Sequence, residues 1–169
     1  MATVNLSDYK PLHITNADDF TIGIVVSEWN DFITFNLRDA TLALLEKEGV
    51  KKENLTVYTV PGAFELSYAS MQLCKTQRFD AVIAIGCVIR GETAHFDYVC
   101  SAVAQGIKDC NTQTDTPTIF CVLTDDTKEQ SIARSGGNLG NKGVEAAVTA
   151  LKMIDFKRGL SPQQNHIGF

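Results

Sequence analysis

Short apolar runs alternate along the chain with segments whose apolar residues recur every three or four positions. The apolar runs are rich in β-branched residues, which predicts buried strands at 20–26, 55–60, 81–85 and 118–123. The periodic segments predict amphipathic helices at 31–48, 63–75, 95–107, 127–134 and 141–157. Strand and helix patterns therefore alternate along the chain, with one additional short helix before the last.

This alternation predicts an α/β fold with a parallel sheet, because parallel strands need crossover connections that are usually helical. We expect a three-layer αβα sandwich around a central parallel four-stranded sheet of the flavodoxin-like kind. Residues 1–169 form a single domain in this interpretation. The polar residues 1–19 are interpreted as an arm, either disordered or strapped onto a neighbouring chain, and 158–169 as a loose C-terminal tail.

Composition and motifs argue against several classes of protein. The chain is 44% apolar and 21% charged with a net charge of -5, and it has no run of basic residues, which argues against a nucleic-acid surface. The pattern shows neither a signal peptide nor a membrane span, so we expect a cytoplasmic protein without membrane contact. The five cysteines lie in apolar patterns and are interpreted as reduced core thiols. The spacing of histidines, cysteines and carboxylates predicts no metal site, and neither a dinucleotide fingerprint nor a P-loop is present.

In open parallel sheets ligands bind beyond the carboxyl ends of the strands. The segments that follow the four predicted strands carry most of the distinctive residues and lie at 27–30, 61–65, 91–95 and 123–125. His95 follows a glycine-containing turn and stands at the start of a helix pattern. It is the best general acid/base candidate, because an imidazole titrates near neutral pH and free backbone N–H groups point at the same place.

Four other residues at this edge each allow two interpretations. Trp29 could stack on a heteroaromatic ring or pack against its own helix. Glu65 could accept hydrogen bonds from hydroxyl groups or serve as a first-turn glutamate favoured by the helix dipole. Arg134 could contact a phosphate group or be solvated, and Lys142 could point at the site or pair with Glu145.

Several ordered motifs resemble the lumazine synthase family and cover most of residues 20–151. They are Trp29-Asn30, VPGAFEL at 60–66, IGCVIRGETAHFDYVC at 85–100, PTIFCVLT at 117–124, and EQSIARSGG with GNKGVEAAVTAL within 129–151. The resemblance implies condensation of 5-amino-6-(D-ribitylamino)uracil with 3,4-dihydroxy-2-butanone 4-phosphate. The products are 6,7-dimethyl-8-ribityllumazine, phosphate and water, in the penultimate step of riboflavin biosynthesis.

The resemblance also assigns roles to individual residues. His95 is implied as the proton shuttle. The residues implied to bind the pyrimidine ring and the ribityl chain are Trp29, Ala63, Phe64, Glu65, Val88, Ile89, Phe120 and Lys142. The residues implied to bind phosphate are Gly91, Glu92, Thr93 and Arg134. The chain departs from the commoner family pattern at Trp29, where phenylalanine is usual, at Ser67, where proline is frequent, and at Asn138, where lysine is frequent.

Partners follow from the same resemblance. It implies two small-molecule substrates, no cofactor and no metal, and a homo-oligomer in which Phe120 belongs to the site of an adjacent subunit. A ring of five, an icosahedral shell of such rings, and riboflavin synthase as a partner are all family properties, and the sequence does not decide between a ring and a shell.

Two alternatives from other classes stay open at this point. A lumazine- or flavin-binding module on the same scaffold would keep Trp29 and the turn at 61–65 but would not need His95 and Arg134 together. A purely structural shell protein would not need His95 either. The presence of both residues favours the enzyme.

Overall fold

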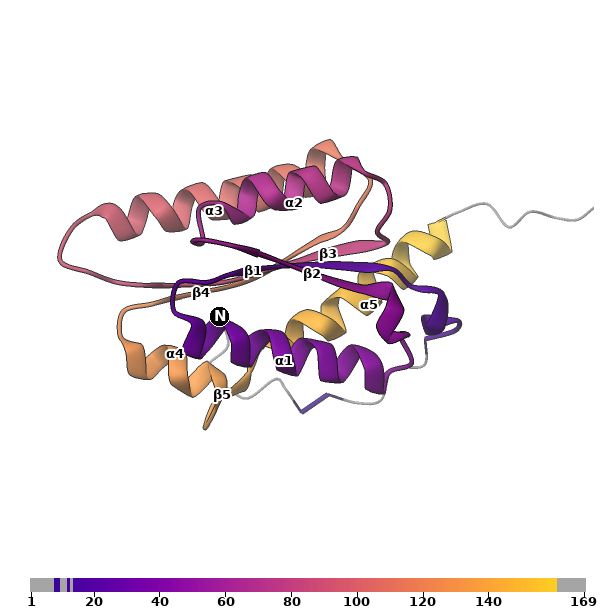
Figure 1. Ribbon diagram of the computed structural model, residues 1–169, viewed down its shortest axis with the longest axis horizontal. Helices are drawn as coiled ribbons and strands as arrows, with labels where there is room; N and C mark the ends of the chain where they lie inside the picture. Colours follow the sequence, from indigo (N-terminus) through magenta and orange to yellow (C-terminus); the bar gives the residue numbers. More distant parts are fainter. Residues whose placement is uncertain (1–7, 10–11, 13, 161–169) are drawn as a thin grey trace, which may run out of the picture.

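The computed structural model describes residues 8–9, 12 and 14–160, and these residues are arranged in three layers (Figure 1). The middle layer is a sheet with the strand order β2-β1-β3-β4, in which every pairing is parallel. Its strands are β1 (Ile22–Ser27), β2 (Leu55–Val60), β3 (Ala81–Ile89) and β4 (Thr118–Asp125). The α/β class and the parallel four-stranded sheet are therefore confirmed, and the order is that of the first four strands of a flavodoxin-like sheet.

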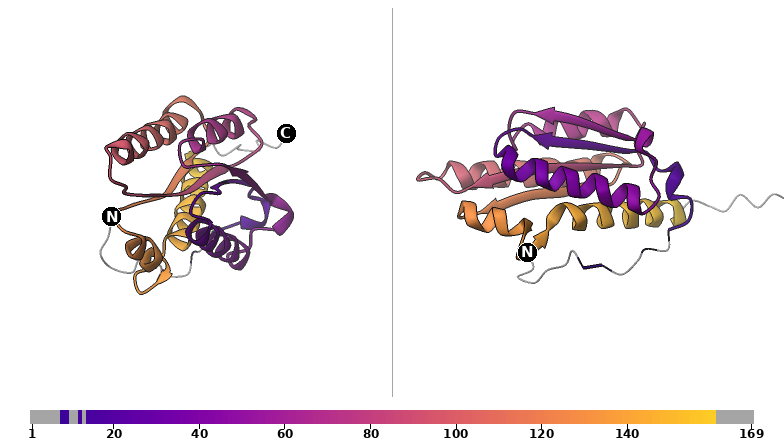
Figure 2. Two further views of the ribbon diagram at one scale, coloured as in Figure 1. Left: turned by 60° about the vertical axis from the view of Figure 1, so that its left-hand side comes forward. Right: turned by 60° about the horizontal axis from the view of Figure 1, so that its bottom comes forward.

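Helices cover both faces of the sheet (Figures 1 and 2). One face is covered by α2 (Leu66–Lys75) and α3 (His95–Gln113), and the other by α1 (Asp31–Lys47), α4 (Lys128–Arg134) and α5 (Lys142–Leu160). Short 3-10 turns at Ala17–Asp19 and Lys52–Asn54 precede β1 and β2. The antiparallel pair β5 (Ser135–Gly137) and β6 (Gly140–Asn141) connects α4 to α5.

The two central strands are buried on both faces, which explains why their sequences are almost continuously apolar. Successive residues of a strand point to opposite faces of the sheet. Ile24 and Ile83 accordingly belong to the core beneath α1 and α5, whereas Val25 and Ala84 belong to the core beneath α2 and α3. All four side chains are fully enclosed.

Several predicted boundaries were wrong, including the end of helix α3, which continues beyond residue 107 to Gln113. Strand β3 continues beyond residue 85 to Ile89, because its second half pairs with the second half of β4. Helix α2 begins at Leu66 rather than at residue 63. Helix α5 continues to Leu160, so the predicted tail is helical at 158–160, and 161–169 lie outside the described residues.

The described part of the N-terminal arm packs against its own chain. Tyr9, Leu12 and Ile14 are partly buried against the core beneath α1 and α5. The hydroxyl of Tyr9 donates a hydrogen bond of 2.8 Å to Glu48 Oε1. The interpretation of 1–19 as an arm that is disordered or strapped onto a neighbouring chain did not foresee these contacts within the chain, and residues 1–7, 10–11 and 13 lie outside the described part.

The described part of the chain contains neither a helix that could span a membrane nor a disulfide. Among the described residues, no helix combines the length and the apolar character needed to cross a bilayer. All five cysteines are unpaired thiols, and four of them are buried, as their apolar sequence surroundings predicted.

Helices α1 and α5 lie side by side beneath the sheet (Figure 2) and meet closely at Gly143. Thr41 Oγ1 lies 2.8 Å from the carbonyl oxygen of Leu37 and 3.0 Å from that of Gly143. A Cβ atom at position 143 would come within 2.1 Å of the Leu37 oxygen. The two helices can therefore approach this closely only because residue 143 has no side chain.

We expect Gly143→Ala to destabilise the fold by about 1–3 kcal/mol, because the overpacked backbone must shift. Gly159→Ala is the matched control, since a Cβ there meets nothing within 4 Å in the same helix. Replacing a helical glycine at an open position should be neutral or slightly stabilising. Denaturant unfolding of both variants measures the difference, and equal stability of the two would show that the close contact at Gly143 is unimportant.

Candidate active site

Seven of the residues predicted for the site line one cavity of about 560 Å³ at the carboxyl edge of the sheet. These residues are Trp29, Ala63, Phe64, Glu65, Val88, Ile89 and His95. Asn30, Cys87 and Val99 also line it and were not predicted for the site. The sequence did carry a signal for Asn30, which directly follows Trp29 in the turn after β1.

The turn after β1 is tied to the end of β2, and this positions Trp29. The backbone N–H of Glu28 donates to the Val60 oxygen at 2.8 Å, and that of Trp29 donates to the Pro61 oxygen at 2.9 Å. The indole remains 67% exposed. It lies against Gly62, where an added Cβ would be 2.5 Å from the indole Cε3. A flat aromatic surface is thus presented at the cavity mouth.

Asn30 connects this turn to the central strand. It adopts a left-handed backbone conformation, with φ 62° and ψ 41°, which asparagine tolerates better than most residues. Its side-chain Nδ2 donates to the Cys87 oxygen at 3.1 Å, and the side chain makes no capping hydrogen bond to α1. Asp31 Oδ1 instead accepts from the backbone N–H of Phe32 at 2.7 Å.

Glu65 closes the turn between β2 and α2. Its Oε2 accepts a hydrogen bond of 3.1 Å from the backbone N–H of Gly62. This bond explains why residues 63–65 form a turn rather than the first turn of the predicted helix. The carboxylate lines the cavity while one of its oxygens is engaged, so it stabilises the turn and still offers the other oxygen to a ligand.

His95 is the first residue of α3 and is exposed. Its backbone N–H donates to Thr93 Oγ1 at 3.4 Å, within a turn whose residues 91–94 are all exposed. The imidazole lines the same cavity as Trp29 and Glu65. The structure therefore brings together an aromatic surface, a carboxylate and an acid/base group, beside the N-terminal end of a helix.

Arg90 anchors the turn at residues 91–94 by pairing with one carboxylate on α3 and another just after β4. Its guanidinium lies 2.7 Å from Asp126 and 3.2 Å from Asp97, and it stacks over the Phe96 ring at 4.1 Å. Hydrogen bonds to Asp126 and then to Asp97 raise the pKa of Arg90. Asp97 therefore forms an ion pair with Arg90, although it lies only two residues after His95 in the sequence.

Six other predicted residues do not line this cavity: Gly91, Glu92 and Thr93 lie in the turn before α3, and Phe120, Arg134 and Lys142 lie on β4, α4 and α5. Phe120 and Lys142 line a second cavity of about 510 Å³, which runs along the outer edge of β4 beside α5. Phe120 is 43% exposed there, whereas Lys142 is almost buried. Lys142 Nζ lies 2.7 Å from Glu145 Oε1. Within a single chain, Lys142 therefore pairs with Glu145, which is one of its two interpretations from the sequence.

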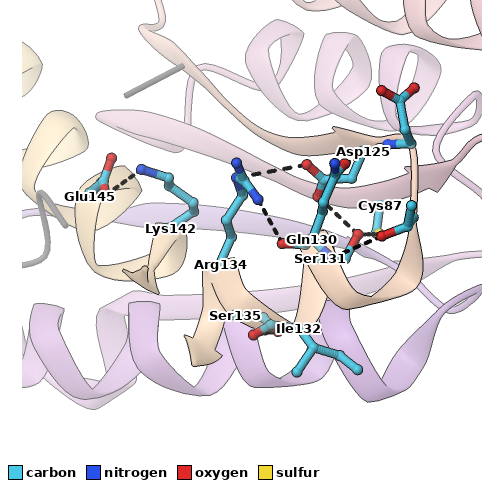
Figure 3. Close-up of polar contacts among 11 residues, drawn as sticks. Cys87, Asp125, Gln130, Ser131, Ile132, Arg134, Ser135, Lys142 and Glu145 are labelled. Atoms are coloured by element: carbon cyan, nitrogen blue, oxygen red, sulfur yellow. Dashed lines mark hydrogen bonds and ion pairs between the residues drawn. The ribbon is translucent and has the colours of Figure 1, made fainter. Parts of the chain in front are cut away.

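Arg134 belongs with this second group. In Figure 3 the guanidinium of Arg134 is directed toward the Asp125 carboxylate, whereas the side chain of Lys142 turns toward Glu145. Arg134 Nε lies 3.7 Å from Asp125 Oδ1, and Nη1 donates to the Gln130 oxygen at 2.9 Å. The chain thus carries two clusters, one around His95 and one around Phe120, Lys142 and Arg134.

Within the described residues, neither a metal-ligand cluster nor a reactive thiol is found at this cavity. No group of three or more histidines, cysteines and carboxylates within residues 8–9, 12 and 14–160 could hold a metal ion. Cys87 lines the first cavity, but burial raises the pKa of its thiol to about 11. It is therefore protonated near neutral pH, where a thiol is a poor nucleophile.

Comparison with known proteins identifies the family. The family model of 6,7-dimethyl-8-ribityllumazine synthase matches residues 19–158. The chain belongs to this family. Proteins of that name from Phocaeicola vulgatus and Parabacteroides distasonis are 51% and 53% identical over 97% and 92% of this chain, each with 99% of its own length covered. A protein of that name from Flavobacterium johnsoniae is 56% identical over 93% of this chain and 83% of its own length.

Membership in the lumazine synthase family confirms the resemblance predicted from the motifs. The matched range contains both clusters, from Trp29 to Lys142. The roles of individual residues in the two clusters remain predictions.

We expect Gly62→Ala to displace the indole of Trp29, because the new Cβ would overlap the ring. Trp29 is the single tryptophan of the sequence, so a shift in the emission spectrum reports directly on its surroundings. Far-UV circular dichroism should stay unchanged. An unaltered emission maximum would show that the indole does not rest on Gly62.

Proposed function

We propose that this chain condenses 5-amino-6-(D-ribitylamino)uracil with 3,4-dihydroxy-2-butanone 4-phosphate to form 6,7-dimethyl-8-ribityllumazine, releasing phosphate and water. This is the penultimate step of riboflavin biosynthesis. The observation that carries the proposal is the convergence of Trp29, Glu65 and His95 on one cavity in a chain of this family.

The first cluster suits the pyrimidine substrate. The exposed indole of Trp29 offers a face for stacking on the heterocycle. Backbone groups of Ala63 and Phe64 would contact the ring, with Val88 and Ile89 forming the apolar floor. Glu65 would accept hydrogen bonds from the ribityl hydroxyls through the carboxylate oxygen that Gly62 does not occupy.

Phosphate binding is assigned to the turn before α3 and to Arg134. Gly91, Glu92 and Thr93 are exposed, and they stand at the N-terminal end of a long helix, where backbone N–H groups and the helix dipole favour anions. A guanidinium adds charged hydrogen bonds that stabilise phosphate as it leaves. His95, next to this turn, would move the protons that imine formation and phosphate elimination require.

Much of the rate acceleration would come from holding two reactants in register. Neither imine formation nor elimination of phosphate requires a redox change, so proton transfer and anion stabilisation by these side chains suffice. The alternative of a binding module without synthase activity is disfavoured, because such a module would not need the pair His95 and Arg134.

We further propose that complete sites form between adjacent copies of the chain, in a ring of five. Phe120 and Lys142 of the second cluster line the cavity along the outer edge of β4, and no strand in the described part of the chain pairs with that edge. Edge strands of this kind are normally covered. A neighbour placed on this edge would bring its first cluster to Phe120, Lys142 and Arg134. Assembly of rings into a shell, and association with riboflavin synthase, rest on the family resemblance alone.

The proposed reaction is tested by His95→Ala. We expect turnover to fall roughly 10- to 100-fold, near the low end for a general acid/base, because positioning of the substrates remains. Affinity for the pyrimidine should be largely kept, since Trp29 and Glu65 are unchanged. The measurements are steady-state formation of the lumazine chromophore and direct titration of the pyrimidine substrate. Unchanged turnover would remove His95 from the mechanism, and collapse of pyrimidine binding would make its role structural.

The shared site is tested by mixing two variants of reduced activity, His95→Ala and Arg134→Ala. In randomly mixed rings, about one quarter of the interfaces should combine two intact clusters and recover activity. Refolding or co-expressing the two chains together, followed by the chromophore assay and light scattering, measures this recovery. Activity equal to the mean of the separate variants, or an active monomer, would place the whole site in one chain.

A further inference from the structure

A buried carboxylate lies beside the arginine of the second cluster (Figure 3). Asp125 is the last residue of β4 and is only 4% exposed. Its Oδ2 accepts a hydrogen bond of 2.9 Å from the hydroxyl of Ser131, which is fully buried on α4. The Cys87 thiol in turn donates to Ser131 Oγ at 3.5 Å. The orientation of the Asp125 carboxylate is thus fixed from the protein interior.

The other carboxylate oxygen faces Arg134. The distance from Asp125 Oδ1 to Arg134 Nε is 3.7 Å, which allows an ion pair but exceeds the length of an ordinary hydrogen bond. Arg134 Nε is enclosed and makes no hydrogen bond with the described residues. Nη1 is held by the Gln130 oxygen at 2.9 Å. The guanidinium therefore has its Nε side turned inward to the carboxylate, while it keeps further N–H donors for a ligand.

We propose that Asp125, held by Ser131, is a positioning residue that orients Arg134 toward the phosphate group of the substrate. The inference rests on the proposed function, in which Arg134 binds that phosphate. Burying a carboxylate without a positive partner costs free energy, so the Asp125 and Arg134 side chains are held together as a pair. One backbone oxygen on the same helix does not fix the plane of a guanidinium, whereas a second contact from β4 does. Asp125 acts through Arg134 and touches no substrate atom.

A simpler role for Asp125 makes the opposite prediction. If the carboxylate only offsets the charge of Arg134, its removal leaves a stronger positive field and phosphate binds more tightly. If the carboxylate orients the guanidinium, its removal lets the side chain turn and phosphate binds more weakly. The sign of the change in phosphate affinity separates the two roles.

The test is Asp125→Asn, which keeps the shape of the side chain and an acceptor for Ser131 but removes the charge. We expect the dissociation constant of inorganic phosphate, titrated by calorimetry, to rise about three- to tenfold. The KM of the phosphorylated butanone should rise by a similar factor, with the KM of the pyrimidine unchanged. Tighter or unchanged phosphate binding would overturn the proposal.

Two further variants exclude a general loss of structure. Ser131→Ala keeps the charge but releases Oδ2, so it should weaken phosphate binding in the same direction and by less; it carries the test if Asp125→Asn does not fold. Asp39→Asn is the matched control, because Asp39 forms an exposed pair with Nε of Arg38 on α1 at 2.7 Å. It should leave phosphate binding and both KM values unchanged.

A double variant links the effect to Arg134. In an Arg134→Ala background, Asp125→Asn should cause no additional loss of phosphate affinity, because the group that it orients is absent. An additional loss of the same size as in the wild type would show that Asp125 acts elsewhere. If Arg134→Ala alone leaves phosphate affinity unchanged, the phosphate role in the proposed function is wrong; if only Asp125→Asn is without effect, the proposed function stands and the positioning role fails.

Discussion

A parallel sheet has to be covered on both faces, and the position of every other part of this molecule follows from that requirement. The strands β1 and β3 are enclosed by helices above and below. Because each strand returns through a helical crossover, all four carboxyl ends lie at the same edge. The polar turns that cannot be buried in the core gather there, and the cavity with Trp29 and His95 is formed among them.

Much of this arrangement could be predicted from the sequence, because the patterns that identify strands and helices are local. The boundaries that failed depend on contacts outside the local pattern. β3 extends to Ile89 because β4 pairs with it, and the pairing partner lies more than thirty residues later in the chain. Helix α2 starts late because Glu65 bonds to the backbone of Gly62, which converts a helix-compatible segment into a turn.

Seven of the predicted site residues line one cavity, but the sequence did not show how the remaining ones group within one chain. The resemblance assigned Phe120 to the site of an adjacent subunit but did not separate Lys142 and Arg134 from His95. Within one chain, Phe120 and Lys142 line another cavity and Arg134 lies beside Asp125. Sequence periodicity indicates that a residue faces outward from a strand or helix, but it does not indicate which outward surface that residue shares with others. The pair of Asp125 and Ser131 was missed for a related reason, since a buried aspartate at a strand end looks in sequence like any polar residue of a turn.

The position of β4 at the edge of the sheet has a consequence for how activity depends on protein concentration. If each chain carries two different half-sites, a closed ring contains as many complete sites as chains, an open string contains one fewer, and a single chain contains none. Specific activity would then follow the association equilibrium and decline on dilution, in the manner of proteins whose stability depends on protomer concentration. Substitutions along the outer edge of β4 would alter catalysis by shifting that equilibrium, even where they touch no substrate.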